Sequence, residues 1–296
     1  MGTPRGGSSP LDRTTLPQRF HSPAYHSCGI RPATCSVSHV HESASSFWIL
    51  RAHHFARAQG WIAGAGLDFE AMANKGFPKQ KGRILNLAVD LSEFRPLLPA
   101  ERTATLQELG LKAPVIGFVG RLTKAKGLDV LMQAMEQIGG ARPWSLLLLG
   151  SGEYQEKVQA WAEKQGWRDR VRIKLVKHAE VPRYLGSMDL MVAPSQTMKN
   201  WREQFGRMLI EAFACGVPVV GSDSGEIPHV IGSAGRVVPE ADVTGWAQAI
   251  AQLLDHPEER DTLRNCGLSR ATQFSTATIA EQYREYYRWL VTQPLQ

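Results

Sequence analysis

Glu203 and Glu211 stand eight residues apart within the stretch 194–228. The pattern around them predicts a loop, a helix that begins near Phe205 and Gly206, a tight turn and a short apolar strand. A helix N-terminus offers free backbone N–H groups and a positive dipole end, which suits a phosphate. Glu203, just before that start, can accept hydrogen bonds from sugar hydroxyls. Glu211, about 12 Å farther along the helix, can hold a ribose diol. The spacing suits a nucleotide diphosphate sugar, and the plain alternative is an amphipathic helix with two solvated carboxylates.

A basic turn, GFVGRLTKAKG at 117–127, follows a predicted strand and leads into a predicted helix. Gly120 allows close approach of the backbone, Arg121 offers a planar fork of donors, and Lys126 offers a point charge. Together these groups suit two phosphates. The alternative is a basic turn on a solvated helix start. Beside the Glu203 motif, we expect the turn to bind a diphosphate.

Further candidates follow other predicted strands. Gly150 lies in a Gly-x-Gly loop, where a structural turn and a close ligand approach are equally compatible with the sequence. His178 fits a base pocket or the surface better than a catalytic base. Ser195 follows a strand end and can border a base or a ribose. Glu226 either reaches the sugar or caps the helix after it.

The elements that must position these residues alternate in type from Pro114 onward. Apolar runs such as VIGFVG, SLLLLG and LMVAPS are separated by segments of helical periodicity. Strands that are apolar throughout and alternate with helices indicate a parallel, doubly wound α/β sheet. Ligands of such sheets bind at the carboxyl ends of the strands, which is where each candidate residue stands.

The motif around the two glutamates resembles that of the family 4 glycosyltransferases. The resemblance runs from about Trp61 to Leu290 and rests on Glu203, Gln204, Phe205, Gly206, Glu211, Ala212, Gly216, Pro218, Val219 and Val220. It implies a retaining enzyme of the GT-B type, which has two Rossmann-like domains. This chain is similar mainly to the C-terminal, donor-binding domain. We expect the first domain, which in the family binds the acceptor, to be truncated or altered here.

The resemblance also implies roles for individual residues. Arg121 and Lys126 would hold the diphosphate and stabilise the leaving group, and Glu203 would orient the transferred sugar, so these three are the expected catalytic residues. Neither a metal nor a cofactor is expected, because no Asp-x-Asp pair is present and the helix amides and cations carry the charge. The expected donor-binding residues are Gly120, Arg121, Lys126, Gly150, Val176, His178, Ser195, Glu203, Phe205, Gly206 and Glu211.

Composition limits the partners. A net charge of +6 suits a nucleotide diphosphate or an anionic membrane surface, and no dense basic run indicates nucleic acid. The four cysteines form no Cys-x-x-Cys pair and are too few for a disulfide scaffold, so a cytoplasmic setting is expected, with peripheral membrane contact as an open option. The acceptor is left open between a glycan, a lipid and a small molecule.

The first sixty residues differ from the rest, with six Arg, no Lys and six of the nine His. A disordered or mistranslated leader, an organelle transit segment and a degraded part of a domain are three explanations. We therefore expect a leader over 1–60, a remnant of the acceptor domain with the interdomain linker over 61–96, the donor-binding domain over 97–275, and a crossover helix over 276–296.

Three functions remain open at this point. The first is a glycosyltransferase that acts with retention of configuration on a nucleotide diphosphate sugar. The second is a nucleotide-sugar binding module without transferase activity, or with its first domain supplied by a partner chain. The third is a sugar-nucleotide epimerase or hydrolase of similar architecture. Products separate them: a glycosylated acceptor, binding without turnover, or free nucleotide with an altered sugar.

Overall fold

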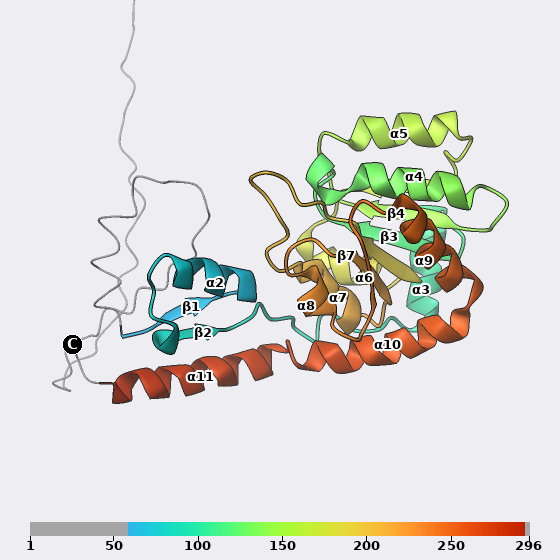
Figure 1. Ribbon diagram of the computed structural model, residues 1–296. Coiled ribbons are helices and arrows are strands. Elements are labelled where there is room, and N and C mark those ends of the chain that lie inside the picture. The colour runs from blue at the N-terminus through green and yellow to red at the C-terminus, as the bar shows by residue number, and fades with distance from the viewer. Residues whose placement is uncertain (1–58, 294–296) are drawn as a thin grey trace, which may run out of the picture. The chain divides into compact units, whose positions relative to one another are not determined.

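The computed structural model describes residues 59–293, and its largest element is a six-stranded parallel sheet with strand order β5-β4-β3-β6-β7-β8 (Figure 1). The chain builds outward from β3 to β5, then returns to the other side of β3 at β6. This is the doubly wound, Rossmann-like α/β fold that the sequence predicts. The strands are β3 (Val115–Val119), β4 (Ser145–Leu149), β5 (Val171–Lys174), β6 (Leu190–Ala193), β7 (Val219–Ser222) and β8 (Arg236–Val238).

Each central strand is apolar throughout because both faces of the sheet are covered. Successive side chains of a strand point to opposite faces, so Leu146 and Leu148 of β4 join one buried cluster while Leu147 and Leu149 join the other. All four leucines are at most 3% exposed. Continuous burial explains why these strands read as unbroken apolar runs in the sequence.

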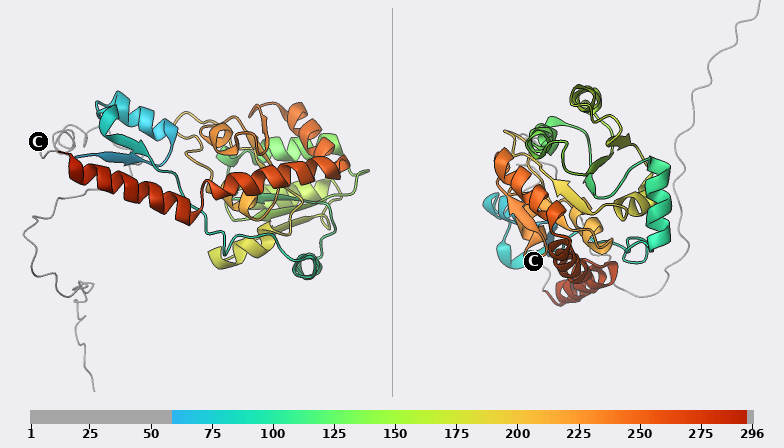
Figure 2. Two further views of the ribbon diagram at one scale, coloured as in Figure 1. Left: turned by 90° about the horizontal axis from the view of Figure 1, so that it is seen from below. Right: turned by 90° about the vertical axis from the view of Figure 1, so that its right-hand side faces the viewer.

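Helices supply the other half of each cluster (Figure 2). One face packs against α4 (Leu128–Ile138), α5 (Gln155–Lys164) and α9 (Val243–Asp255). The opposite face packs against α3 (Pro99–Leu109), α6 (Val181–Leu185), α7 (Arg207–Ala214) and α8 (Ile227–Ile231). The sequence predicts a helix only over 104–109, whereas α3 begins five residues earlier at Pro99, a residue that suits the first helical turn.

Before the large sheet, β1 (Trp61–Ala63) and β2 (Gly82–Ile84) form a parallel pair joined through α2 (Gly66–Asn74). Trp61, Ala63 and Phe77 make a small separate core, and Phe69 stacks on Trp61 with ring centroids 4.6 Å apart. The sequence predicts an extended segment over 83–89, whereas the strand β2 in the structure ends at Ile84. The leader predicted over 1–60 lies almost wholly outside the described residues, and the domain boundaries stay predictions.

The last helix, α11 (Thr276–Thr292), returns to the β1–β2 pair. The Tyr286 hydroxyl donates to the backbone carbonyls of Trp61 (3.1 Å) and Lys81 (2.6 Å). From the sequence we expect an exposed face of the first-domain piece, together with the aromatic side chains of this helix, to make the chain sticky or oligomeric; these side chains are Tyr283, Tyr286, Tyr287 and Trp289. That expectation is wrong for Tyr286, which is 4% exposed because it packs under the pair of strands.

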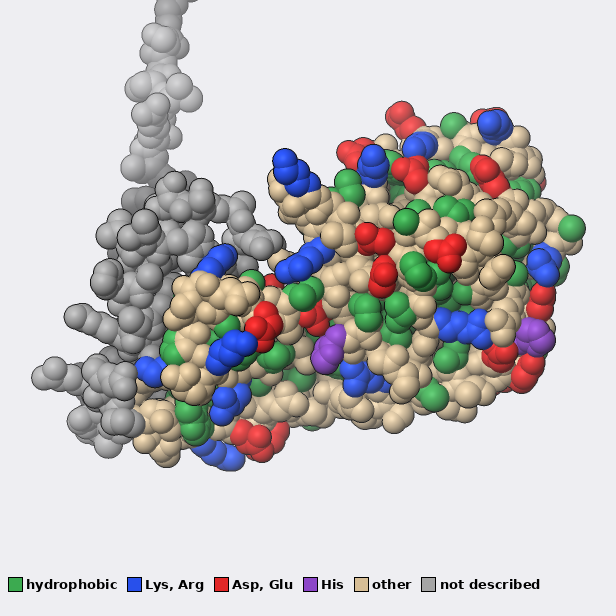
Figure 3. Space-filling view, viewed as in Figure 1, with side chains coloured by type: hydrophobic (Ala, Val, Ile, Leu, Met, Phe, Trp, Pro, Cys, Tyr) green, Lys and Arg blue, Asp and Glu red, His purple; other side chains and the backbone are tan. Residues whose placement is uncertain are grey.

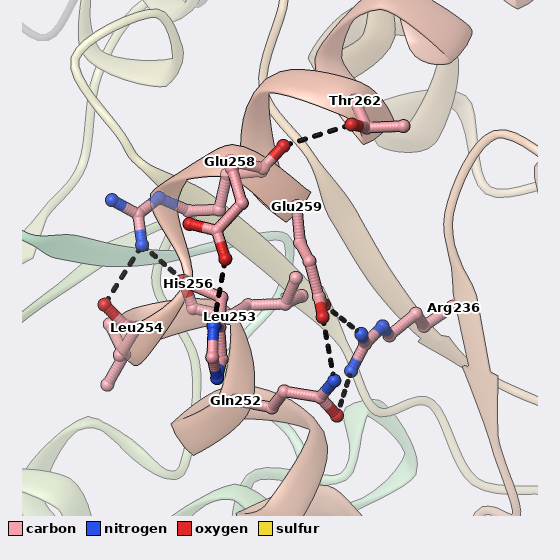
Figure 4. Close-up of polar contacts among 9 residues, drawn as sticks. Arg236, Gln252, Leu253, Leu254, His256, Glu258, Glu259 and Thr262 are labelled. Atoms are coloured by element: carbon pink, nitrogen blue, oxygen red, sulfur yellow. Dashed lines mark hydrogen bonds and ion pairs between the residues drawn. The ribbon is translucent and has the colours of Figure 1, made fainter.

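Sequence periodicity misses α10 (Pro257–Thr272), whose apolar face is narrow. Its later turns pack against α7 through Gly267 and Ala271, and polar contacts hold its first turns, as Figure 4 shows. The Arg236 guanidinium bonds to Gln252 (2.9 Å) and pairs with Glu259, and the Gln252 amide donates to Glu259 (2.9 Å). The junction between α9 and α10 is thus fixed by side chains that no apolar pattern reveals.

Candidate functional site

The candidate residues gather where the order of the strands reverses. β3 and β6 are neighbours in the sheet, yet β4 and β5 stand between them in the sequence. In doubly wound folds the crevice outside the carboxyl ends of such strands binds ligands. Gly120 and Arg121 directly follow β3, and Ser195 follows β6 by one residue. The topology therefore brings both predicted motifs to one point.

Three of the predicted residues are in direct contact at this point. The Lys126 Nζ donates to Glu203 Oε2 at 2.5 Å, and the Ser195 Oγ donates to the same oxygen at 3.0 Å. The Lys126 and Glu203 side chains are only 13% and 11% exposed. Among the described residues, both bonds to this carboxylate end on Oε2. Oε1 is therefore available, within the described residues, to accept a hydrogen bond from a hydroxyl group of a ligand.

Backbone contacts fix the position of Glu203. Its carbonyl accepts a hydrogen bond from the Glu226 N–H at 3.0 Å. Gly225, with φ +60°, allows that approach, because a Cβ on it would lie 1.9 Å from the Glu203 carbonyl oxygen. Gly206, with φ +80°, then turns the chain into α7. The spacing from Glu203 to Gly206 in the sequence is thus set by the turn that leads from the Glu203 backbone contact into α7.

Three further hydroxyl side chains that were not among the predicted site residues, those of Thr197, Ser222 and Ser224, line the same strand ends. The Ser222 Oγ donates to the Ser195 carbonyl at 2.6 Å, and the Thr197 and Ser224 hydroxyls lie 3.1 Å apart. Ser195, Ser222 and Ser224 are each at most 1% exposed. A polar residue at the end of an apolar strand is the signal that could have identified Ser222.

The second carboxylate lies in a different polar neighbourhood. Arg207 Nε donates to Glu211 at 3.0 Å, one helical turn away, and Arg207 Nη2 lies 3.4 Å from His178 Nε2. Glu211 is 6% exposed although it lies on a helix, which excludes the interpretation of two solvated carboxylates. Burial raises the pKa of the Glu211 carboxyl, and the charge of Arg207 opposes that rise. The two glutamates thus face separate partners along α7.

The two glycine loops lie against each other. A Cβ on Gly150 would lie 1.9 Å from the Gly120 carbonyl oxygen, and the Leu122 N–H donates to the Ser151 carbonyl at 2.8 Å. Close packing of backbone therefore accounts for Gly150 without a ligand. Arg121 beside them is exposed, and within residues 59–293 no hydrogen bond or ion pair engages its guanidinium. Arg121 is available to an anion.

Other predicted donor-binding residues serve the core. Phe205 is 5% exposed and meets Phe274 edge to face, with ring centroids 5.8 Å apart. Val176 is partly buried against the same cluster. A ligand contact at Phe205 would have to come from its backbone. The proposed ligand contacts of all these residues stay predictions.

Glu226 makes a contact that neither alternative included. Its side chain forms no cap on α8, so the capping alternative is wrong. The carboxylate instead accepts a hydrogen bond from the Leu67 N–H in the first turn of α2. Glu226 is 6% exposed, and the free amides at a helix start are favourable partners for a carboxylate. Contact with a sugar stays a prediction.

Two wider features complete the description. On the face shown in Figure 3, acidic and basic side chains are interspersed over the described residues. Within the same residues no three His, Cys, Asp or Glu side chains group as metal ligands, and no helix combines the length and apolar character that a membrane span needs. The expectation that no metal or cofactor is required stays a prediction.

Comparison with known proteins places this geometry in a family. The model of the glycosyl transferases group 1 matches residues 102–270, which is more than half of the chain. The D-inositol 3-phosphate glycosyltransferase of Segniliparus rotundus is 33% identical over 219 residues, covering 71% of this chain and 47% of that protein. The GDP-mannose-dependent monoacylated alpha-(1-6)-phosphatidylinositol monomannoside mannosyltransferase of Corynebacterium glutamicum is 33% identical over 185 residues, covering 60% of this chain and 48% of the relative.

A solved structure shares the fold. Anabaena HepE, crystallised in complex with UDP and glucose, superposes with a TM-score of 0.71 at 21% identity, covering 81% of this chain and 66% of that one. The chain spans about half the length of the curated relatives it matches. On the family match, which contains the whole Lys126–Glu203–Ser195 cluster, the chain belongs to the glycosyl transferases group 1.

Proposed function

We propose that the chain binds a nucleotide diphosphate sugar at the crevice between β3 and β6 and transfers the sugar with retention of configuration, as in family 4 glycosyltransferases. The observation that carries this proposal is the largely buried Lys126–Glu203–Ser195 cluster at the switch point. Lys126 shares the turn 117–127 with Arg121, whose guanidinium has no partner within the described residues. Two cations in one turn, a carboxylate and a helix start suit a diphosphate joined to a sugar.

The proposed chemistry is electrostatic. Lys126, Arg121 and the first amides of α7 stabilise the negative charge that develops on the leaving diphosphate. Glu203 Oε1 accepts a hydrogen bond from a hydroxyl group of the transferred sugar and thereby orients the sugar. Glu211 holds the ribose diol at the other side of α7, near His178. Each of these groups binds or orients, and the acceptor oxygen attacks from the face that the diphosphate leaves.

The comparisons support a nucleotide sugar as the class of donor, and they do not select its base or its sugar. HepE was crystallised with UDP and glucose, while the mannosyltransferase relative depends on GDP-mannose, so uracil and guanine are both candidate bases. We extend the nucleotide-sugar class to this chain, and a hexose is the sugar we propose. The acceptor, the cytoplasmic location and any peripheral membrane contact remain the predictions made from the sequence, as does the absence of a nucleic-acid partner.

The test is calorimetric titration of the purified chain with UDP, GDP, ADP and dTDP, followed by incubation with the sugar nucleotide of the base that binds. Lys126→Met, which keeps the length of the side chain but removes its charge, serves as the matched control. We expect the wild-type chain to bind one of the four diphosphates and the Lys126→Met variant to bind that diphosphate weakly. A glycosylated product with the same anomeric configuration as the donor supports transfer with retention. Free nucleotide with an epimerised sugar would contradict transfer.

A further inference from the structure

Trp201 contacts the cation at the centre of the candidate site. Lys126 Nζ lies 4.9 Å from the centroid of the Trp201 ring, while the same ammonium pairs with Glu203 at 2.5 Å. Trp201 comes from the loop between β6 and α7, two residues before Glu203. It lies outside the motif on which the resemblance rests. One ammonium therefore has a ring on one side and a carboxylate on another.

The backbone holds that ring in place. Met198 and Trp201 exchange two hydrogen bonds, N–H to carbonyl at 2.7 Å and 3.3 Å, which closes a tight turn. Nearer the strand, the Gln196 N–H donates to the Ala125 carbonyl at 2.8 Å, and Ala125 precedes Lys126. The loop that carries Trp201 is thus tied to the turn that carries Lys126.

A second anchor fixes the loop from the far side. The Thr197 N–H donates to the Glu240 carboxylate at 2.7 Å, and the Gln196 amide donates to the Glu240 carbonyl at 2.6 Å. Glu240 follows β8, the edge strand of the sheet. Since the residues just before the turn are anchored at both Ala125 and Glu240, the loop places the indole against Lys126.

A tryptophan face and a carboxylate act differently on an ammonium. A carboxylate neutralises the charge, whereas an aromatic face attracts the cation and leaves its charge available to a second anion. A lysine side chain also loses rotamer freedom when it binds, and that entropy opposes binding. A ring that already restricts the rotamers of Lys126 lowers the entropic cost of binding an anion.

We propose that Trp201 is a positioning residue for Lys126, which it holds in the orientation that meets the diphosphate of the donor. This inference rests on the proposed function. It assigns the ring a role in binding the diphosphate and none in binding the base or the sugar. The consequence is a specific coupling between Trp201 and Lys126, measurable only with ligands that carry phosphate.

The experiment is a double-mutant cycle of Trp201→Leu and Lys126→Met, with Trp201→Phe as the variant that keeps an aromatic face. Calorimetry measures the affinity of the full chain for whichever of UDP, GDP, ADP and dTDP binds, for the matching nucleoside, and for the sugar nucleotide. We expect Trp201→Leu to weaken diphosphate binding about three- to tenfold. Nucleoside affinity should be unchanged, and Trp201→Phe should retain most of the wild-type affinity.

In the Lys126→Met background, Trp201→Leu should cause no further loss of diphosphate affinity. An equal loss in both backgrounds, an equal loss for the nucleoside, or wild-type affinity in Trp201→Leu would each overturn the inference while leaving the proposed function intact. A loss confined to the sugar nucleotide would place the ring on the sugar, which also overturns it. If the wild-type chain binds none of the four diphosphates, the inference and the proposed function both fail.

Discussion

At the scale of single residues, the Lys126–Glu203 pair implies an exchange of partners. Under the proposed function, a diphosphate that binds Lys126 would draw the ammonium away from a carboxylate that is shielded from water. A shielded carboxylate without a partner would oppose binding strongly. Ser195 avoids that outcome because its hydroxyl already donates to the same oxygen. Glu203 would therefore keep the hydrogen bond from Ser195 and could accept further hydrogen bonds from the hydroxyls of the proposed sugar.

Arg121 offers the most direct test of the phosphate site, because its guanidinium has no partner within residues 59–293 to lose. Arg121→Ala should weaken nucleotide diphosphate binding by about 1.5–3 kcal/mol, the range for hydrogen bonds to charged groups. Its thermal midpoint should match that of the wild type. Lys124→Ala, an exposed cation in the same turn, is the control and should bind normally in calorimetry. Equal losses in the two variants would show only a general charge effect.

Glu211 makes a prediction about pH. Because burial raises its pKa in the folded chain, the folded state binds a proton more tightly than the unfolded state does. The stability that this group contributes is fully present below the unfolded pKa, near 4.5, and is lost as pH rises through the raised folded value. The free energy of unfolding of the wild type, minus that of Glu211→Gln, should therefore fall across that window. Urea titrations at several pH values measure it, and a difference that rises with pH would contradict the assignment.

At the scale of elements, the turn before α7 depends on a glycine from another loop. Gly225→Ala would place a Cβ against the Glu203 carbonyl in a left-handed conformation. We expect a loss of at least about 2 kcal/mol in the free energy of unfolding, from strain and overpacking together. Diphosphate affinity should fall as Glu203 shifts. Gly64→Ala is the matched control, since a Cβ there meets no heavy atom within 4 Å, and its denaturation curve should stay close to the wild type.

Some features of these elements can be predicted from the sequence and others cannot. The apolar strands and the loop at 194–206 are predictable because continuous burial and a helix start leave local signals. Trp201 and the Glu226–Leu67 bond are not, since each joins residues that only the folded chain brings together. Helix α10 is missed for a related reason: its apolar face is narrow, and its first turn is held by hydrogen bonds from Arg236 and Gln252 to Glu259. Periodicity reports burial and is silent on polar contacts across elements.

At the scale of the whole molecule, the β1–β2 pair is linked to later elements through α11 and the chain before it. The Val89 N–H donates to the Phe274 carbonyl at 2.8 Å, and the Thr276 N–H donates to the Val89 carbonyl at 3.1 Å. The Tyr286 hydroxyl adds its two bonds to backbone carbonyls. These contacts connect segments that stand near opposite ends of the described chain.

Tyr286→Phe should therefore destabilise the chain by about 1–3 kcal/mol, because it removes the hydroxyl that donates to the Trp61 and Lys81 carbonyls while changing the side-chain volume little. Denaturant unfolding, followed by circular dichroism, measures the change. Tyr287→Phe provides the comparison, since Tyr287 is 39% exposed and should tolerate the loss of its hydroxyl. A similar loss in both variants would mean that the bonds to Trp61 and Lys81 contribute nothing particular.

The strand order also has a consequence for how the chain acquires its fold. β3, β4 and β5 can pair in the order in which they are synthesised, but the other half of the sheet attaches only when Ile116 meets Leu190 across the centre. Loop closure over so long a separation is slow, and parallel pairing cannot begin from a hairpin. We expect stopped-flow refolding to show an early phase in which β3 to β5 assemble, and a later phase that slows in variants of the β3–β6 seam. During that interval the unpaired edge of β3 is open to other chains, so refolding yield should fall as protein concentration rises.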